Sequence, residues 1–383
     1  MLFEAPPLDA QETAVLANIE ELRSSLRFAV REQRRWTGML RRTLFARAIQ
    51  GSNSIEGINV TRDDALAAVE GGEPLEATEQ NWAAVVGYRS AMTFVMALAD
   101  DPHFAYSTDT IRSLHFMMIQ HDTLQKNPGR WRPGHVYVRN SESGEIVYEA
   151  PDADRVPALM SELVDSLNNE SSAPAIVRAA LAHLNLVLIH PFSDGNGRMA
   201  RGLQTLVLAR EGILAPQFSS IEEYLGRNTQ SYYDVLAAVA KGYWQPENDT
   251  RPWIRYCLTA HYVQAQTVLR RTKEAERLWE LLKAELEPKD LPERVIFALF
   301  DAAYGYRVRR STYQPTAEIE EHTASRDLRA LVDADYLVAH GERRGRYYVA
   351  SDRLQKIRSR SLEVKTLIVD PFDRNSLGKP AKQ

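Results

Sequence analysis

The sequence has very little cysteine, since its 383 residues include only one, Cys257. A single cysteine excludes an internal disulfide bond and a cysteine-rich zinc site. It also suits a reducing compartment, so we expect a cytoplasmic protein. The first residues lack the charged segment and apolar core of a secretory signal. The most apolar run, residues 175–189, is interrupted by Arg178, His183 and Asn185, so it predicts a core helix and no membrane partner.

Neither sign of charge is in excess. Lys and Arg together number 47 and Asp and Glu 51, which gives a formal net charge of -4. This balance argues against affinity for nucleic acid along the whole chain, although it allows a local basic patch. With 44% hydrophobic and 26% charged residues, the composition is that of a globular protein. The length predicts two or three domains.

One stretch concentrates chemically active side chains. Residues 190–201 read His-Pro-Phe-Ser-Asp-Gly-Asn-Gly-Arg-Met-Ala-Arg. The apolar run before it predicts a buried helix, and after it apolar residues recur at helical spacing until Gly212. The stretch is therefore predicted to be a loop between two helices, the second of which starts within residues 196–198.

This loop has the composition of a phosphate-binding site. Gly195 and Gly197 allow backbone conformations that turn successive N–H groups into one concavity. The helix N-terminus directly behind them adds unpaired donors and a positive dipole end. Arg198 and Arg201 lie three residues apart on the new helix and supply forked donors for further phosphate oxygens.

Two further side chains point to chemistry at the bound phosphate. Asp194 is an oxygen ligand of the kind that Mg²⁺ prefers when it also binds substrate phosphates. His190 is able to take a proton near neutral pH. The arrangement indicates phosphoryl or nucleotidyl transfer onto a hydroxyl. A glycine-rich turn with a solvated Asp and Arg pair is the alternative.

The stretch resembles the motif of the Fic family, His-x-Phe-x-Asp/Glu-Gly-Asn-Gly-Arg-x-x-Arg, at every fixed position. The resemblance implies an all-α core with a β-hairpin flap and adenylyl transfer from ATP, with Mg²⁺, to a Ser, Thr or Tyr hydroxyl of a protein, the chain itself included. It implies that His190 is the catalytic base and Asp194 the Mg²⁺ ligand, and that Phe192 anchors the loop. The implied phosphate-binding residues are Gly195, Asn196 (through its side chain), Gly197, Arg198 and Arg201.

An upstream helix carries a second motif. The helix over residues 44–55 is predicted to end at Glu56-Gly57, which places Ser52 and Glu56 on one face. A glutamate at the negative end of a helix dipole favours a cationic partner, although an exposed polar helix end is the alternative. Ser52-x-x-x-Glu56-Gly57 resembles the inhibitory motif of the family. The resemblance implies that Glu56 pairs with Arg201, in the subgroup with an N-terminal inhibitory helix.

A β-hairpin is predicted in an otherwise helical region. Residues 136–140 and 145–148 alternate like strands and flank a Ser-Glu-Ser-Gly turn. A surface hairpin without function is one interpretation. The resemblance implies a flap that aligns the target by strand addition, with Val138 beside the nucleotide. It also implies that Tyr232 and Tyr233 lie against the nucleotide. His115 and His121 are interpreted as packing or surface residues.

The last part of the chain has its own plan after a Pro-containing boundary at residues 287–292. Helices are predicted at 293–304, 316–320 and 323–332, then strands near 337–338 and 347–349, an order that resembles a winged helix. Arginines could give this module a basic face, but three aspartates dilute it, so DNA binding stays open and contact with a protein is favoured. The arginines are Arg326, Arg329, Arg343, Arg344 and Arg346, and the aspartates are Asp327, Asp333 and Asp335.

The predicted organisation therefore combines an all-α Fic-type core with its flap and a C-terminal α+β winged-helix domain. The predicted parts are an N-terminal helical region (1–100) with the inhibitory helix (43–57), the catalytic core (101–250), connecting helices (251–290), the winged helix (291–352) and a polar tail (353–383). Removal of AMP with Glu56 positioning water, phosphorylation and phosphocholine transfer remain alternative activities. A transcription regulator with a nucleotide-sensing core is a further alternative, and a homodimer stays open.

Overall fold

The computed structural model describes residues 1–30, 34–122, 127–139, 143–212, 215–289, 291–342, 345–364 and 370–373. The chain is mostly helical with two small antiparallel sheets, as the sequence predicts. The first helices are α1 (Ala10–Ala29), α2 (Arg35–Ile55), α3 (Arg62–Glu70), α4 (Glu79–Asp100), α5 (Thr108–Ile119), α6 (Val156–Asn168), α7 (Ala175–Ile189) and α8 (Asn196–Arg210). They are followed by α9 (Pro216–Ser219), α10 (Glu222–Arg227), α11 (Thr229–Ala240), α12 (Arg251–Leu286), α13 (Ile296–Ala303), α14 (Arg310–Thr316), α15 (Glu321–Asp333) and α16 (Asp352–Ser361). Short 3₁₀ turns cover Gln120–Asp122, Ala153–Arg155 and Glu293–Val295.

The predicted flap is a two-stranded hairpin, β1 (Tyr137–Arg139) with β2 (Ile146–Glu149), in which Val138 pairs with Tyr148. Its connecting residues 140–142 lie outside the described ranges. A second hairpin, β3 (Leu337–His340) with β4 (Tyr347–Ala350), lies in the C-terminal module. The predicted wing residues Arg343 and Arg344 fall outside the described residues.

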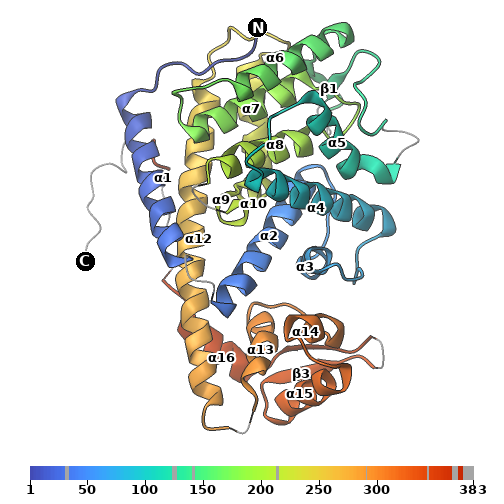
Figure 1. Cartoon of the computed structure of the whole chain (residues 1–383), viewed down its shortest axis with the longest axis vertical. Helices are drawn as coiled ribbons and strands as arrows, with labels where there is room; N and C mark the ends of the chain where they lie inside the picture. Colours follow the sequence, from blue (N-terminus) through green and yellow to red (C-terminus); the bar gives the residue numbers. More distant parts are fainter. Residues whose placement is uncertain are drawn as a thin grey trace.

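The longest helix, α12, joins the main helical body to a C-terminal module (Figure 1). Trp253 and Leu258 in its first half pack into the larger hydrophobic core. Leu278 and Leu282 in its second half pack into a second core with α13–α16. Residues 251–286 thus form one helix of 36 residues, whereas the sequence predicts several connecting helices in this region.

The helix α2 also takes part in both cores. Trp36, Leu40 and Leu44 in its first half are buried in the second core, whereas Ile49 and Ile55 belong to the larger one. The C-terminal module therefore shares its core with the N-terminal helices, and α2 leads from that module to its own C-terminus at Glu56.

The apolar segment that the sequence predicts as a core helix is α7, which packs against α8 in the larger core. The helix α4 is long and apolar enough to cross a membrane by length and composition. It also packs against α5 and α8, and core helices share these properties, so composition alone does not indicate a membrane span.

Two predictions of local structure are wrong. The helix predicted at 316–320 lies earlier in the chain, as α14, which ends at Thr316. Beyond it, Glu318 has a left-handed backbone conformation with φ of +54°, which does not continue a helix. The tail predicted from residue 353 begins with α16, which Ser351 caps and which buries Leu354 and Ile357.

Candidate active site

The predicted loop lies between α7 and α8. His190 caps α7 with φ of +51°, and its N–H donates to the carbonyl of Leu186. Gly195 precedes α8 with φ of +75°, and a Cβ there would lie 2.8 Å from the Cδ1 of Ile119. A side chain at this position would be strained and would collide, which explains the glycine. The start of α8 points its unpaired N–H groups into the loop.

The interior of the loop is held by Asn196. Its side-chain oxygen accepts a hydrogen bond from the N–H of Phe192 (2.9 Å), and its Nδ2 donates to the carbonyl of Phe192 (2.9 Å). Both polar ends of this side chain thus bind the protein backbone, and its predicted contact with phosphate stays a prediction. Phe192 is fully buried, as expected of an anchor, and stacks on the ring of His115 at 3.6 Å.

His115 contributes more than the packing that the sequence suggested. Its Nδ1 accepts the N–H of Gly129 (2.9 Å), so the proton is on Nε2, which donates to the carbonyl of Asp194 (2.9 Å). Burial lowers the pKa of His115 to about 4, which keeps the ring neutral. A buried histidine therefore fixes the backbone that presents the Asp194 carboxylate.

Arg132, to which the sequence assigns no role, holds the other end of the loop. Its Nε donates to the carbonyl of His190 (2.8 Å), and its two terminal nitrogens donate to the carbonyls of Gly134 and Pro151. Its own N–H donates to Pro191. One buried guanidinium thus joins the segment before the flap, the start of the loop and the segment after the flap.

The ring of His190 is oriented for proton transfer. Its Nδ1 lies 3.1 Å from the carbonyl of Val187, so Nδ1 carries the proton and Nε2 has a free lone pair. Burial, and to a smaller extent the positive charge of Arg132, lower the pKa of His190 below its usual value of 6.5. The imidazole is therefore neutral at pH 7, as a general base must be.

Arg198 has donors that the surrounding protein does not use. It is 1% exposed, and its Nη2 lies 3.3 Å from the Oδ2 of Asp194. Its Nε and Nη1 are buried and find no acceptor within the described part of the chain. Burial lowers the pKa of this guanidinium, because the charge is poorly compensated. An unpaired buried donor is costly, so this site fits an anion such as phosphate.

Arg201 is held by α2. Its Nε donates to the Oγ of Ser52 (2.7 Å), and its Nη2 donates to the carbonyl of Ser52 (2.9 Å) and to the Oε1 of Glu56 (2.7 Å). Burial alone would lower the pKa of Arg201, but the charge and hydrogen bond of Glu56, together with Tyr232 and Tyr88, outweigh it, and the pKa is raised. A Cβ on Gly197 would collide with Glu56 Oε1, so the glycine lets the carboxylate reach the arginine.

The remaining candidate residues differ in how far they face the site. Tyr232 is 1% exposed and its hydroxyl is hydrogen-bonded to His183 (2.9 Å). Its placement against a nucleotide stays a prediction. Tyr233 is 44% exposed and donates to the carbonyl of Ile55 at the end of α2 (3.1 Å). Val138 packs from the flap onto the larger core. Contact of Tyr233 and Val138 with a nucleotide stays a prediction.

The fold and the site define a class of protein, a helical domain with an anion site at the start of one central helix. Residues 105–208 match the Fic/DOC family, so this part of the chain is a Fic/DOC domain. The matched range contains α5, the flap, α6, α7 and most of α8, and thus the loop, whereas Ser52 and Glu56, which hold Arg201, lie outside it.

The chain is also similar to curated proteins that are named protein adenylyltransferases. The chain is 30% identical over 258 residues to "Protein adenylyltransferase fic-1" of Caenorhabditis briggsae, which covers 66% of this chain and 46% of that protein. The fic-1 protein of Caenorhabditis elegans gives the same values, with 30% identity over 258 residues, which cover 66% of this chain and 46% of that protein. The chain thus spans about half the length of the curated relatives it matches.

Solved structures have a similar fold. A Fic family protein from Desulfovibrio desulfuricans G20 aligns with a TM-score of 0.59 and 23% identity, over 91% of this chain and 99% of that one. A structure of Fic-1 from C. elegans aligns with a TM-score of 0.52 and 25% identity, over 67% of this chain and 71% of that one. The first similarity extends beyond the Fic/DOC domain to most of the chain.

Proposed function

We propose that the chain is a protein adenylyltransferase, which moves AMP from ATP to a Ser, Thr or Tyr hydroxyl of a protein target and is inhibited by Glu56. The curated relatives are named for this activity. The observation that carries the proposal is the set of buried, unpaired donors of Arg198 and Arg201 beside a neutral His190. These groups suit a polyphosphate and an incoming hydroxyl.

The reaction follows from the geometry of these residues. The target hydroxyl oxygen attacks the α-phosphorus of ATP, its proton passes to Nε2 of His190, and the bond to the pyrophosphate oxygen breaks. General-base assistance of this kind contributes about 10²–10⁴ in rate. The N–H groups at the start of α8 and the Arg198 guanidinium stabilise the charge that gathers on the phosphates and on the leaving pyrophosphate. Arg201, once freed, binds the terminal phosphate.

The residues present also fit a Mg²⁺ ion. The Asp194 carboxylate is 36% exposed at the loop, and His115 fixes the backbone behind it. Within the described ranges no group of three or more His, Cys, Asp or Glu side chains could hold a metal. A single carboxylate beside substrate phosphates is a usual way for proteins to hold Mg²⁺. The ion would neutralise charge on the α- and β-phosphates.

Inhibition by α2 follows from the ion pair. While Glu56 occupies Nη2 of Arg201, that nitrogen cannot bind a phosphate oxygen, and ATP would be held with its α-phosphorus out of line. A misplacement of about 1 Å can cost on the order of 10² in rate.

Incubation of the Glu56→Gly variant with Mg-ATP, followed by intact mass spectrometry, tests the proposal. Adenylylation adds one AMP group, whereas phosphorylation adds one phosphate. Parallel reactions with ATP labelled at the α or the γ position separate these outcomes. Label from neither position, on the protein itself or on lysate proteins, would contradict both forms of transfer and favour removal of AMP, with Glu56 positioning a water.

The C-terminal module has the element order of a winged helix, α13, α14 and α15 followed by the β3–β4 hairpin. We propose that it selects partners. Arg326 and Arg329 are exposed on α15, whereas Asp327 is buried and binds Arg294 (2.7 Å), so this aspartate does not dilute the basic face. The carboxylates of Glu321 and Asp333 are exposed and therefore dilute the basic face. A pulldown on genomic DNA tests the regulator alternative, and a protein contact is favoured.

A further inference from the structure

A row of buried polar side chains extends from Arg201 away from the nucleotide side. Ser52 Oγ accepts from Nε of Arg201 (2.7 Å), and both Ser52 and Arg201 lower the pKa of the Tyr88 hydroxyl on α4, which burial raises. Tyr88 donates to the Oε1 of Glu222 at the start of α10 (2.5 Å). The row ends on this carboxyl group, which lines the same small cavity as Arg201.

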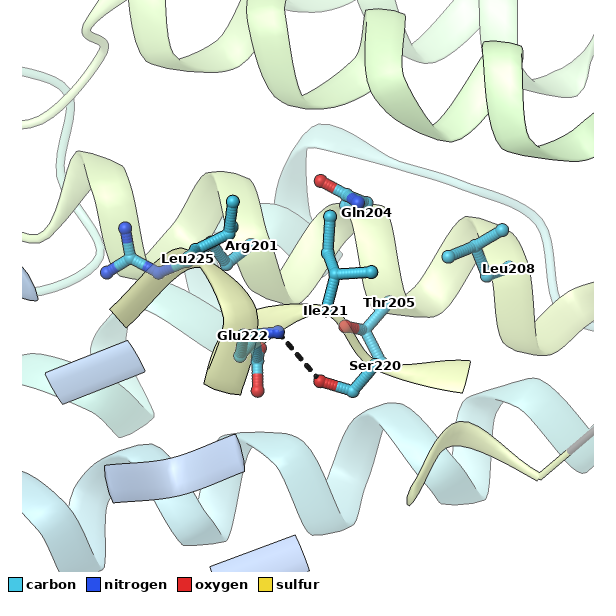
Figure 2. A pocket seen from close by; sticks show the side chains of 8 residues that line it. All are labelled: Arg201, Gln204, Thr205, Leu208, Ser220, Ile221, Glu222 and Leu225. Carbon is cyan, nitrogen blue, oxygen red and sulfur yellow. Dashed lines mark hydrogen bonds between the residues drawn. The ribbon is translucent and has the colours of Figure 1, made fainter. Parts of the chain in front are cut away.

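All four side chains are buried. Ser52 and Tyr88 are 0% exposed, Arg201 1% and Glu222 2%. Figure 2 shows Glu222 across from α8, on the segment that also presents Ser220, whose Oγ accepts the N–H of Glu222 (3.2 Å). The cavity between the two segments has about 10 Å³, room for about one water, and is therefore not a nucleotide site.

The backbone around Glu222 holds the row in place. A Cβ on Gly51 would lie 2.5 Å from the carbonyl oxygen of Glu222, and a Cβ on Gly226 would lie 2.8 Å from the Cα of Gly51. The two glycines let α10 and α2 touch through their backbones beside Ser52. A close backbone contact of this kind fixes the distance between Ser52 and the carboxyl group.

Arg201 is the charged group that acts on the carboxyl group of Glu222. The chain supplies Tyr88 from α4, Arg201 from α8 and Ser220 from its own segment. Neighbouring Glu223 is engaged elsewhere, since its carboxylate binds Arg271 (2.8 Å) and other arginines. Burial raises the pKa of Glu222 to about 7, while Tyr88 and Arg201 favour the ionised form.

We propose that Tyr88 and Glu222 are positioning residues, which hold the Arg201 guanidinium in place as a buried negative partner when Glu56 has released it. This inference rests on the proposed adenylyl transfer. A buried guanidinium needs a negative partner. Glu56 is that partner in the inhibited state, but it must leave for Arg201 to bind phosphate. Glu222 remains, because it contacts Arg201 only indirectly and from the opposite side.

The experiment uses full-length protein with the Glu56→Gly substitution, into which Tyr88→Phe or Glu222→Gln is added. Both additions keep the shape of the side chain. Tyr313→Phe is the matched control, because Tyr313 also donates from a buried hydroxyl to a carboxylate, Asp327 (2.9 Å), but in the C-terminal module. Initial rates of labelling are measured against Mg-ATP concentration at pH 6, 7 and 8, and Mg-ATP binding is measured without target.

We expect Tyr88→Phe and Glu222→Gln to raise KM and Kd for Mg-ATP on the order of tenfold at pH 8, with a smaller change in kcat, since a hydrogen bond to a charged group is removed. For Glu222→Gln the difference from the parent shrinks toward pH 6, where the carboxyl group of the parent is itself protonated. The control keeps the parent values. KM and Kd that match the control at every pH, or a Glu222→Gln effect that does not depend on pH, would overturn the inference. Absence of labelling in Glu56→Gly itself would instead overturn the proposed function, and the binding measurement would still decide the positioning role.

Discussion

The Oε1 of Glu56 lies 2.7 Å from Nη2 of Arg201, although the two residues are separated by 145 positions in the chain. The contact is made at the last turn of α2, where the carboxylate meets the negative end of the helix dipole. The arginine on α8 compensates for that unfavourable position. The ion pair therefore stabilises the end of α2 while it occupies a donor of the phosphate site.

Glu56→Gly is expected to raise the rate of adenylylation by a factor on the order of 10². Without Glu56, Arg201 can bind the terminal phosphate, and the α-phosphorus of ATP is then in line for attack. Glu56→Gln, which keeps the volume and removes the charge, is expected to fall between the variant and the parent. The measurement is the initial rate of labelling from α-labelled ATP at saturating Mg-ATP. Adding Arg201→Ala should remove the gain, and a Glu56→Gly rate equal to that of the parent would refute inhibition by this contact.

His190→Ala, made in the Glu56→Gly background, is expected to lower labelling by about 10²–10⁴ and to leave the Kd for Mg-ATP within a few-fold of the background. In the proposed reaction the phosphates are bound by α8 and the arginines, whereas the imidazole acts on the hydroxyl. Since burial lowers the pKa of His190, the loss of rate on acidification should occur at a lower pH than for an ordinary histidine. Undiminished labelling by His190→Ala would exclude His190 as the base.

The stability of the protein should reflect the buried carboxyl group of Glu222. Its pKa of about 7 in the folded protein lies above the ordinary value of 4.5. The folded state therefore binds more protons between these values, and this contribution to stability is lost as the pH rises through about 7. The difference in melting temperature, parent minus Glu222→Gln, should decrease as the pH is raised from 5 to 8. A difference that stays constant over this range would show that Glu222 does not titrate there.

The loop could be predicted from the sequence because its chemistry is local. Glycines, a helix start and two arginines within twelve residues are sufficient to indicate a phosphate site. The supports of the loop could not be predicted, because His115 acts on a carbonyl 79 residues away and Arg132 on one 58 residues away. A periodic pattern in the sequence does not indicate contacts between residues so far apart in the chain.

Two other features could not be predicted for the same physical reason. The side chain of Asn196 binds the N–H and the carbonyl of Phe192, and no sequence pattern indicates these contacts. The helix α16 was missed because it is mostly polar. Its few buried residues, Leu354 and Ile357 among them, give it a place in the second core that depends on the fold.

The last prediction concerns Arg42 on α2, which binds Asp301 of α13 (2.5 Å) and Glu70 of α3. The arginine and both carboxylates have side chains only 13% exposed, so the contacts are largely removed from solvent. The sequence predicts a domain boundary at residues 287–292, at which the chain could be cut. The shared second core indicates otherwise, because the cut would also uncover the apolar face of α2.

Asp301→Asn in the full-length chain is therefore expected to lower the free energy of unfolding by ~2 kcal/mol, less than the loss of a whole buried pair because Glu70 stays in contact with Arg42. It should also raise basal labelling, since α2 carries Glu56 at its far end and a loosened α2 holds Arg201 less firmly. Denaturant unfolding and α-labelled ATP measure the two effects. Glu211→Gln, which removes a more exposed ion pair with Arg178, is the control and should change both by little. Lower stability with unchanged basal labelling would show that the C-terminal module supports α2 without influencing the inhibitory contact.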